Sequence, residues 1–345
     1  MDFELDEAQQ VIAASVAEVL GRAKGGGAGG KAGGKDGAGG KDGPGGTIED
    51  AAAWRGLAEA GLLGLTRPEW LGGDGLGVVE ASIVLTEVGR QAAAVPALAT
   101  IMLGVLPVVR SGSRDLQERL LAGTLTAGVR GHATADAGSV TGTLVGVPSA
   151  GDADWILVPV GADVAVVAAG TVSMTRTLAS WPEYTVRLDR APVTGVLAGA
   201  ATDLYQLAAA GAAAMADGAV AGALDLTAKH IATREQFGRP LATFQAVAQQ
   251  IADVYVISRT LHLAALSACW RLASGRDAAE DCDVAAYWLA AEAPTALRTC
   301  HHLHGGLGMD ISYPLHRYFT MITDLARFVG GAEYRLERLA PCSPT

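Results

Sequence analysis

The residues best suited to chemistry stand in the stretch "REQFGRP", at positions 234–240, inside an otherwise apolar and helical part of the chain. Arg234 presents a planar fork of N–H donors whose geometry matches the oxygens of a phosphate or a carboxylate. Gly238 and Pro240 are poor helix formers, so the stretch is expected to interrupt a helix. The pattern predicts an anion-binding site at a helix break. The alternative is an ordinary surface salt bridge from Arg234 to Glu235 or Asp253.

A second group of candidate residues is "HHLHGG", at positions 301–306. Three imidazoles suggest a metal ion, but no carboxylate stands at ligand spacing on their face, so no metal site is predicted. Gly305 and Gly306 would let a ligand approach the backbone closely, or they simply end a helix. The four cysteines form no C-x-x-C pair and are expected to be reduced, mostly buried thiols.

The elements that must position these residues are mainly helical, with an inserted β unit. Residues 1–122 are predicted to form an N-terminal helical domain, with a helix over 2–22, a helix capped by Thr47 and another ending near Pro96. Residues 123–198 have short valine-rich runs cut by Gly, Pro, Ser and Asp, which predicts a small middle β domain. Residues 199–345 are predicted to form a C-terminal four-helix bundle, with long helices over 208–236, from Leu241 past Trp270, over 283–304 and after Pro314.

A glycine-rich tract interrupts the first domain: fourteen of residues 21–46 are glycine. Such a segment has high backbone entropy and little to bury, so residues 23–46 are predicted to be a flexible linker. A phosphate-binding loop is the rival interpretation. It is disfavoured because no strand precedes the tract and no G-K-[ST] ends it.

Composition excludes several classes of partner. The net charge is −10, and apart from the four lysines of the glycine tract the basic residues are scattered, so nucleic acid and anionic membranes are poor partners. No apolar run reaches about 18 residues without Gly, Pro or charge, so no membrane span is expected. The acidic start "MDFELDEAQQ" is unlike a secretory signal, and a cytoplasmic location is expected.

Three motifs in order resemble the acyl-CoA dehydrogenases, a family of flavoproteins. They are "WRGLAEAGLLGLTRPEWLGGDGLG" (54–77), "TREQFGRPLATFQAVAQQIADV" (233–254) and "LHGGLGMDISYPLHRYF" (303–319). The helix–β–helix order agrees as well. The resemblance implies the acyl-CoA dehydrogenase-like fold and α,β-dehydrogenation of an acyl-CoA thioester.

In this family, the arginine motif of one subunit holds the adenine and pyrophosphate half of an FAD whose ring lies in the neighbouring subunit. By resemblance, Arg234 and Gln236 contact the pyrophosphate and Phe237 packs on the adenine side. The family commonly has Gln at the position of His302. The full set of cofactor-binding residues that the resemblance implies is Arg234, Gln236, Phe237, Phe244, Gln245, His302, Leu303, His304, Gly305 and Gly306.

The family's catalytic base, however, is absent from both places where the resemblance locates it. The usual Glu-Gly falls on Val329 and Gly330, and the alternative position falls on Leu204. A hydrocarbon side chain cannot accept the α-proton of a substrate. Asp203 should point elsewhere because one residue rotates a helical side chain by about 100°. Glu333 is expected to pair with Arg335 or Arg338.

The β unit also departs from the family. The family run T-E-P-x-A-G-S-D is reduced to Thr134 and Ala137-Gly138-Ser139 within "GHATADAGSVTG" (131–142). The tryptophan that stacks on the flavin has become Val147. Residues that hold the ring and deprotonate the substrate are therefore lost together, whereas those that hold a neighbour's FAD remain.

This pattern predicts the non-catalytic, FAD-clamping subunit of an α2β2 acyl-CoA dehydrogenase. FAD is shared with a homologous partner subunit that carries the catalytic Glu and binds most of the acyl-CoA. By family analogy the substrate is a steroid (cholesterol) side-chain acyl-CoA, as in actinobacterial split dehydrogenases. Two alternatives stay open: a self-sufficient homotetrameric dehydrogenase with an unidentified base, and a flavin-free scaffold protein.

Overall fold

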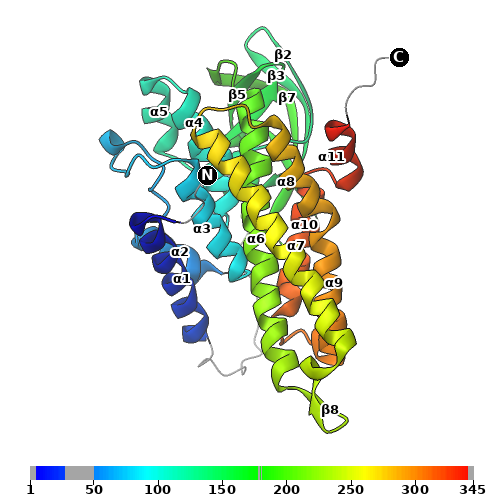
Figure 1. The fold of residues 1–345 in the computed structure, drawn as a ribbon. Coiled ribbons are helices and arrows are strands. Elements are labelled where there is room, and N and C mark those ends of the chain that lie inside the picture. Colours follow the sequence, from blue (N-terminus) through cyan, green and yellow to red (C-terminus); the bar gives the residue numbers. More distant parts are fainter. Residues whose placement is uncertain (1–4, 28–49, 178, 180, 341–345) are drawn as a thin grey trace, which may run out of the picture. The chain divides into compact units, whose positions relative to one another are not determined.

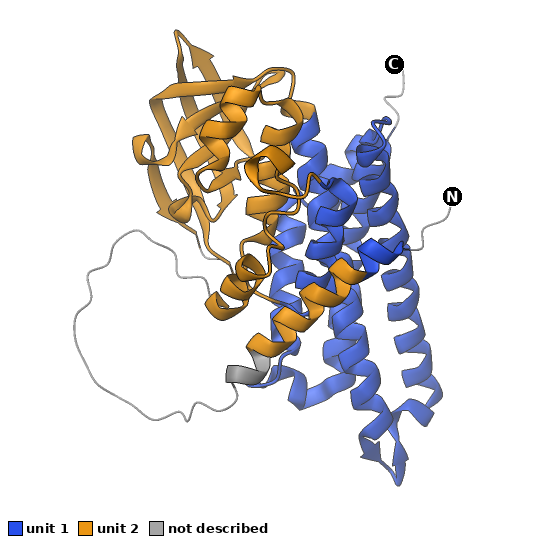
Figure 2. Cartoon of the chain, turned by 90° about the vertical axis from the view of Figure 1, so that its left-hand side faces the viewer, with its two compact units in different colours: residues 1–10, 76–92, 203–345 blue, residues 11–75, 93–202 orange. Residues whose placement is uncertain are grey.

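A computed structural model describes residues 5–27, 50–177, 179 and 181–340 (Figure 1). The chain divides into two compact units, shown in separate colours in Figure 2. One comprises residues 1–10, 76–92 and 203–345, and the other comprises residues 11–75 and 93–202. The predicted glycine linker (23–46) and the predicted cap Thr47 lie almost entirely outside the described residues. The three predicted domain boundaries stay a prediction.

The first unit is a bundle of helices. Its helices α6 to α10 run side by side, and the short hairpin β8–β9 projects beyond the ends of α6 and α7 (Figure 1). Their bounds, with α3 and α11, are α3 Val78–Arg90, α6 Ala201–Thr233, α7 Gln245–Ala273, α8 Ala279–Ala291, α9 Ala293–His304, α10 Leu315–Phe328 and α11 Ala332–Leu339.

Helix α6 packs on α3 by direct contact of backbone with backbone. A Cβ atom placed on Gly218 would lie 1.8 Å from the carbonyl oxygen of Thr86, and one on Gly89 would lie 1.9 Å from that of Met215. The Thr86 hydroxyl donates to the carbonyl oxygen of Ala214 at 3.1 Å. The small residues that predicted a long, closely packed helix therefore let its axis approach its neighbour.

The predicted helix over 283–304 is in fact two helices, α8 and α9, which meet at Glu292. Pro294 stands in the first turn of α9, where its missing N–H is no loss, and it cannot continue the preceding helix. Helix α3 likewise ends at Arg90 rather than near Pro96, and Ala92 just beyond it has a left-handed backbone (φ 46°).

The second unit combines short helices with a sheet. Helix α1 (Glu7–Gly27) begins in the first unit and continues to five residues past its predicted end at residue 22. Helix α2 begins at Ala51, and the Asp50 carboxylate before it accepts from the backbone N–H of Ala94 at 2.8 Å. The remaining helical elements are η1 Glu69–Leu71, the π-helix η2 Leu98–Val105, α4 Leu106–Ser111, α5 Arg114–Leu121, η3 Ala150–Asp152 and η4 Ala169–Thr171.

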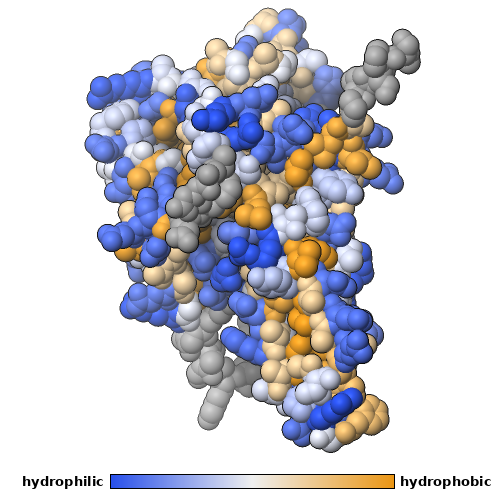
Figure 3. Space-filling model, viewed as in Figure 1, coloured by the Kyte–Doolittle hydropathy of each residue, from blue (hydrophilic) through white to orange (hydrophobic). Residues whose placement is uncertain are grey.

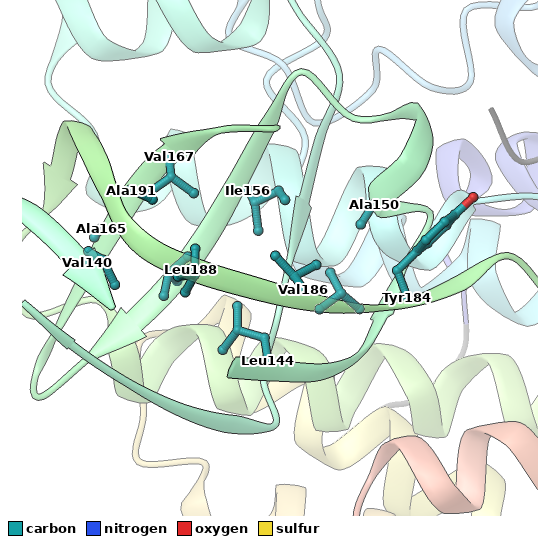
Figure 4. Packing of buried hydrophobic residues seen from close by; sticks show 12 residues of the cluster. Val140, Leu144, Ala150, Ile156, Ala165, Val167, Tyr184, Val186, Leu188 and Ala191 are labelled. Atoms are coloured by element: carbon teal, nitrogen blue, oxygen red, sulfur yellow. The ribbon is translucent and has the colours of Figure 1, made fainter. Parts of the chain in front are cut away.

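A seven-stranded sheet accounts for the predicted β unit, with strand order β1-β4-β5-β7-β3-β2 and β6 paired to β7. Only β1 and β4 are parallel. Buried side chains such as Leu144, Ile156 and Val186 pack into its core (Figure 4). The strands are β1 Leu125–Ala127, β2 Gly131–Asp136, β3 Ser139–Pro148, β4 Trp155–Val160, β5 Asp163–Ala168, β6 Ser173–Arg176 and β7 Glu183–Leu197.

One described helix, α6, is long and apolar enough by length and composition to cross a membrane. However, 89% of its apolar 18-residue stretch is buried inside the structure, as in the central helix of a packed bundle.

Candidate functional site

The arginine motif forms an exposed hairpin at the end of α6. Strand β8 (Glu235–Gln236) pairs with β9 (Arg239–Pro240) around a two-residue turn. Phe237 and Gly238 in this turn both have positive φ, 51° and 75°, as a type I′ turn requires. A phenylalanine is costly in that conformation, and this one is 92% exposed. A strained, exposed aromatic side chain points to a binding role.

Aromatic and guanidinium groups gather beside this turn. The Phe237 and Phe244 rings meet edge to face, with centroids 6.3 Å apart, and the Arg239 guanidinium lies 4.1 Å from the centroid of Phe244. Arg234 is exposed, and among the described residues neither Glu235 nor Asp253 forms an ion pair with it. The surface-salt-bridge alternative is therefore not what the structure forms.

The N-terminus of α7 opens directly after Phe244. Its first turn has no acidic residue and no side-chain cap, and Gln245, its first residue, is exposed. The unpaired N–H groups and the helix dipole make such an end attractive to an anion. The first helical turn and the hairpin arginines thus offer one region of positive potential.

The second predicted segment lies at the end of α9. His302 is exposed, whereas the side chains of Leu303 and His304 are buried. Gly305 follows with φ 57° and ψ −134°, a conformation that residues with a side chain rarely adopt. No atom lies within 4 Å of the Cβ positions of Gly305 or Gly306, so this backbone is open to a ligand.

These two segments fit the phosphate-containing half of a dinucleotide. Exposed guanidiniums and an uncapped helix start can hold phosphate oxygens, an exposed aromatic can cover a base, and an open glycine backbone can lie against either. The structure brings the segments together through stacked rings of His230 and His304, whose centroids are 4.4 Å apart. Whether each residue of the implied set contacts FAD remains a prediction.

Both implied positions for the base hold buried hydrocarbon side chains. Val329 is 2% exposed at the end of α10, and Leu204 in α6 is fully buried. The Val329 carbonyl oxygen accepts from Nε of Arg335 at 2.7 Å, which fixes the turn into α11.

The expected pairing of Glu333 with Arg335 or Arg338 is wrong. Both arginines bind the buried carboxylate of Asp283 on α8 instead, at 2.7 Å and 2.9 Å. Arg335 and Arg338 lie three residues apart, so they project from one face of α11 toward the bundle.

In the β unit, the residues that are left from the flavin-ring motif pack or hydrogen-bond within this chain. Val147 is fully buried in the core of the sheet. The Ser139 hydroxyl donates to the carbonyl oxygen of Asp136, and Ala137-Gly138 form the turn between β2 and β3. None of these side chains offers an exposed aromatic surface.

Sequence reasoning missed His230, Arg239 and Tyr313. Arg239 could have been found from its place directly before Pro240 in the same hairpin. Tyr313 lies in the quoted motif at 303–319, but no role was assigned to it, and His230 carries no local signal because its contact with His304 joins two different helices.

Other reactive side chains are buried. Burial raises the pKa of Cys269 to about 12 and that of Cys300 to about 11, and it also raises the pKa of Cys282. The three described cysteines are free and buried, as predicted, and Cys342 lies outside the described residues. No group of His, Cys, Asp or Glu is placed to hold a metal ion in the described part of the chain.

Comparisons with known proteins agree with this geometry. Residues 45–127 match the family model for the acyl-CoA dehydrogenase N-terminal domain, and residues 199–340 match that for the C-terminal domain. The chain is 47% identical over 320 residues to the acyl-CoA dehydrogenase FadE28 of Mycobacterium tuberculosis, covering 86% of this chain and 94% of that protein. It is 35% identical over 325 residues to FadE27 of the same organism, covering 84% of this chain and 87% of FadE27.

Solved structures lead to the same fold. The ChsE4-ChsE5 complex from Mycobacterium tuberculosis matches with a TM-score of 0.85 and 30% identity over 98% of each chain. A variant of the Tcur3481-Tcur3483 steroid ACAD matches with a TM-score of 0.85 and 27% identity over 96% of each chain. The predicted fold class is confirmed, and the chain belongs to the acyl-CoA dehydrogenase family.

Proposed function

We propose that this chain is the non-catalytic, FAD-clamping subunit of an α2β2 acyl-CoA dehydrogenase. The observation that carries the proposal is the contrast between its two sets of family positions. Val329 and Leu204, where a base would stand, are buried and apolar, whereas Arg234, Gln236, Phe237 and Gln245 are exposed on a hairpin and a helix start.

A chain with these side chains cannot start the family reaction alone. Dehydrogenation removes an α-proton from the acyl thioester, and loss of a general base costs about 10²–10⁴-fold in rate. The catalytic Glu and the isoalloxazine site therefore belong to a homologous partner subunit. FAD, when bound, supplies the hydride acceptor.

The part of this chain is to hold and orient the cofactor. The guanidinium of Arg234, with the N–H groups at the start of α7, takes the pyrophosphate charge. Phe237 covers the adenine side, and the backbone of Gly305 and Gly306 lies against the cofactor. In a dry interface such charge-assisted hydrogen bonds are stronger than in water.

The partner is a homologous acyl-CoA dehydrogenase subunit. Helix α7 presents Tyr255, Val256 and Leu263 as exposed side chains, and apolar residues interrupt the hydrophilic surface over this face of the bundle (Figure 3). Such a surface favours burial against another chain. The solved ChsE4-ChsE5 complex and the Tcur3481-Tcur3483 steroid ACAD, which both match this chain, further support a heteromer.

By family analogy we infer a steroid side-chain acyl-CoA as the substrate, bound mainly by the partner, and the similarity to a steroid ACAD supports the steroid part. Cytoplasm is the compartment we infer.

The decisive experiment is co-expression with a candidate partner, followed by a flavin count. Each FAD needs a ring site and a clamp on opposite subunits, and this chain supplies only the clamp. We therefore expect a single FAD per heterodimer. A count of two would mean that this chain also has a ring site, and a colourless, stable complex would favour the flavin-free scaffold.

A further inference from the structure

The two predicted cofactor-binding segments meet through His230 and His304. His304 belongs to the predicted cofactor-binding set, but it is buried, and the proposed function gives neither histidine a direct contact with FAD. His230 stands in the last turn of α6, four residues before Arg234, and His304 ends α9 directly before Gly305. Their rings stack with centroids 4.4 Å apart and planes inclined by 17°. Each ring is therefore joined to one of the two segments.

His304 is fixed in one orientation by hydrogen bonds on both nitrogens. Nδ1 lies 2.8 Å from the carbonyl oxygen of Cys300, which can only accept, so Nδ1 carries the proton. Nε2 lies 3.0 Å from the Tyr313 hydroxyl and accepts from it when the ring is neutral. The side chain is only 5% exposed, so it cannot turn without breaking both bonds.

Hydrogen bonds to the backbone fix the arginine hairpin and the glycine segment beside the stacked histidines. The Arg234 N–H donates to the His230 carbonyl oxygen at 2.8 Å, and the Arg234 carbonyl oxygen accepts from Leu241 at 2.8 Å. On the other side, the ring of His301 forms a hydrogen bond with the backbone of Gly308, of the kind that raises the pKa of an imidazole. A Cβ atom on Gly308 would lie 3.2 Å from Nδ1 of that ring, so the glycine segment is held closely as well.

We propose that the His230–His304 stack, locked by Tyr313, is a positioning device that sets the spacing between the arginine hairpin and the glycine segment. This inference rests on the proposed clamp function and extends it. Neither ring needs to touch the cofactor. Both act through Arg234 and through the backbone of Gly305 and Gly306, which must face one dinucleotide at the same time.

The device works with neutral rings. Burial lowers the pKa of His304, and burial followed by the nearby charge of Arg234 lowers the pKa of His230. The other groups that face the rings are Tyr313 and His301. An unstacked histidine titrates near pH 6.5. As the pH falls below about 6.5, the unstacked state takes up protons more readily than the stacked state, so the stack weakens.

The test uses His230→Ala and His230→Phe in the co-purified heteromer, with the FAD dissociation constant measured by flavin fluorescence. Because a stacked aromatic pair contributes modestly, His230→Ala should weaken FAD binding about two- to tenfold. His230→Phe keeps a ring in the stack without a titrating group. It should bind FAD within about twofold of the parent, with a smaller loss below pH 6.5. Thr320→Val, whose hydroxyl bonds only to its own helix, is the matched control.

A second readout needs no flavin. In the heteromer freed of flavin, His230→Ala should speed amide hydrogen exchange in residues 303–309, although the substitution lies on another helix, and His230→Phe should not. Equal effects of the Ala and Phe variants on affinity and exchange, or no effect of either, would overturn the positioning role. If instead Arg234→Ala leaves FAD affinity unchanged, the clamp function itself fails.

Discussion

Arg234 is the residue on which the proposed clamp depends most directly. Its guanidinium is exposed beside the open start of α7, and no described carboxylate competes for it. Arg234→Ala should therefore weaken FAD retention in the heteromer by about ten- to a hundredfold, because a charge-assisted hydrogen bond contributes roughly 1.5–3 kcal/mol. The fraction of flavin released on dilution of the heteromer measures FAD retention.

Arg298→Ala is the matched control for Arg234→Ala. Arg298 is an exposed arginine of the same bundle whose guanidinium bonds to Thr295 one turn away. It should leave retention unchanged. Equal retention by both variants would contradict the clamp.

Val329→Glu tests whether this chain has a catalytic pocket of its own. If the ring site and thioester belong to the partner, a carboxylate at Val329 should leave the dehydrogenation rate nearly unchanged. It should lower stability, because an unpaired carboxyl group would replace a buried apolar side chain. Steady-state turnover and the thermal midpoint of the complex are the measurements. Val329→Leu is the control for volume alone, and a rate increase in the Glu variant would mean that this chain has its own pocket.

At the scale of elements, the crossing of α3 and α6 is the most sensitive contact described. Gly218→Ala should destabilise the complex by about 1–3 kcal/mol, since its Cβ would overlap the backbone oxygen of Thr86 at 1.8 Å. Thermal unfolding monitored by circular dichroism would show a lower midpoint.

Gly21→Ala provides the comparison. Gly21 lies inside α1 with no atom within 4 Å of its Cβ position, so alanine there should stabilise the helix by about 0.5–1 kcal/mol. A loss at Gly21 equal to that at Gly218 would assign the effect to helix composition rather than to the crossing.

Periodicity and composition predicted most of the elements because most are decided locally. The long helices α6 and α7 and the β unit follow from runs of alanine, leucine and valine. The break at Glu292 could have been predicted from Pro294. The early end of α3 could not, because it depends on Ala92 adopting a left-handed backbone, and no local pattern in "GRQAAAVP" requires that.

Part of the site could also be predicted from the sequence, because some of its residues lie in short local motifs. Arg234 and Gly305 lie in short motifs, so sequence alone indicated them. The partners of Arg335 and Arg338 were predicted wrongly, because Asp283 lies about fifty residues away in the chain and reaches them only in the folded bundle. The same holds for His230 and His304, which are 4.4 Å apart in space and on different helices.

At the scale of the whole molecule, the proposed dependence on a partner predicts the behaviour of the chain alone. Expressed without a partner, it should be colourless or poorly soluble, because the exposed Tyr255, Val256 and Leu263 of α7 would lack a covering surface. Co-expression should restore soluble, yellow protein. Size-exclusion chromatography with absorbance detection of flavin distinguishes these outcomes, and a soluble, yellow, active lone chain would support the homotetramer.

The burial of Val329 also has an evolutionary consequence. If Val329 stands at the position of a lost base, a single codon change no longer restores that base, because the new carboxylate would meet packed side chains and the turn that Arg335 holds. A lineage that carries such a subunit could then not regain a self-sufficient enzyme by one substitution at Val329.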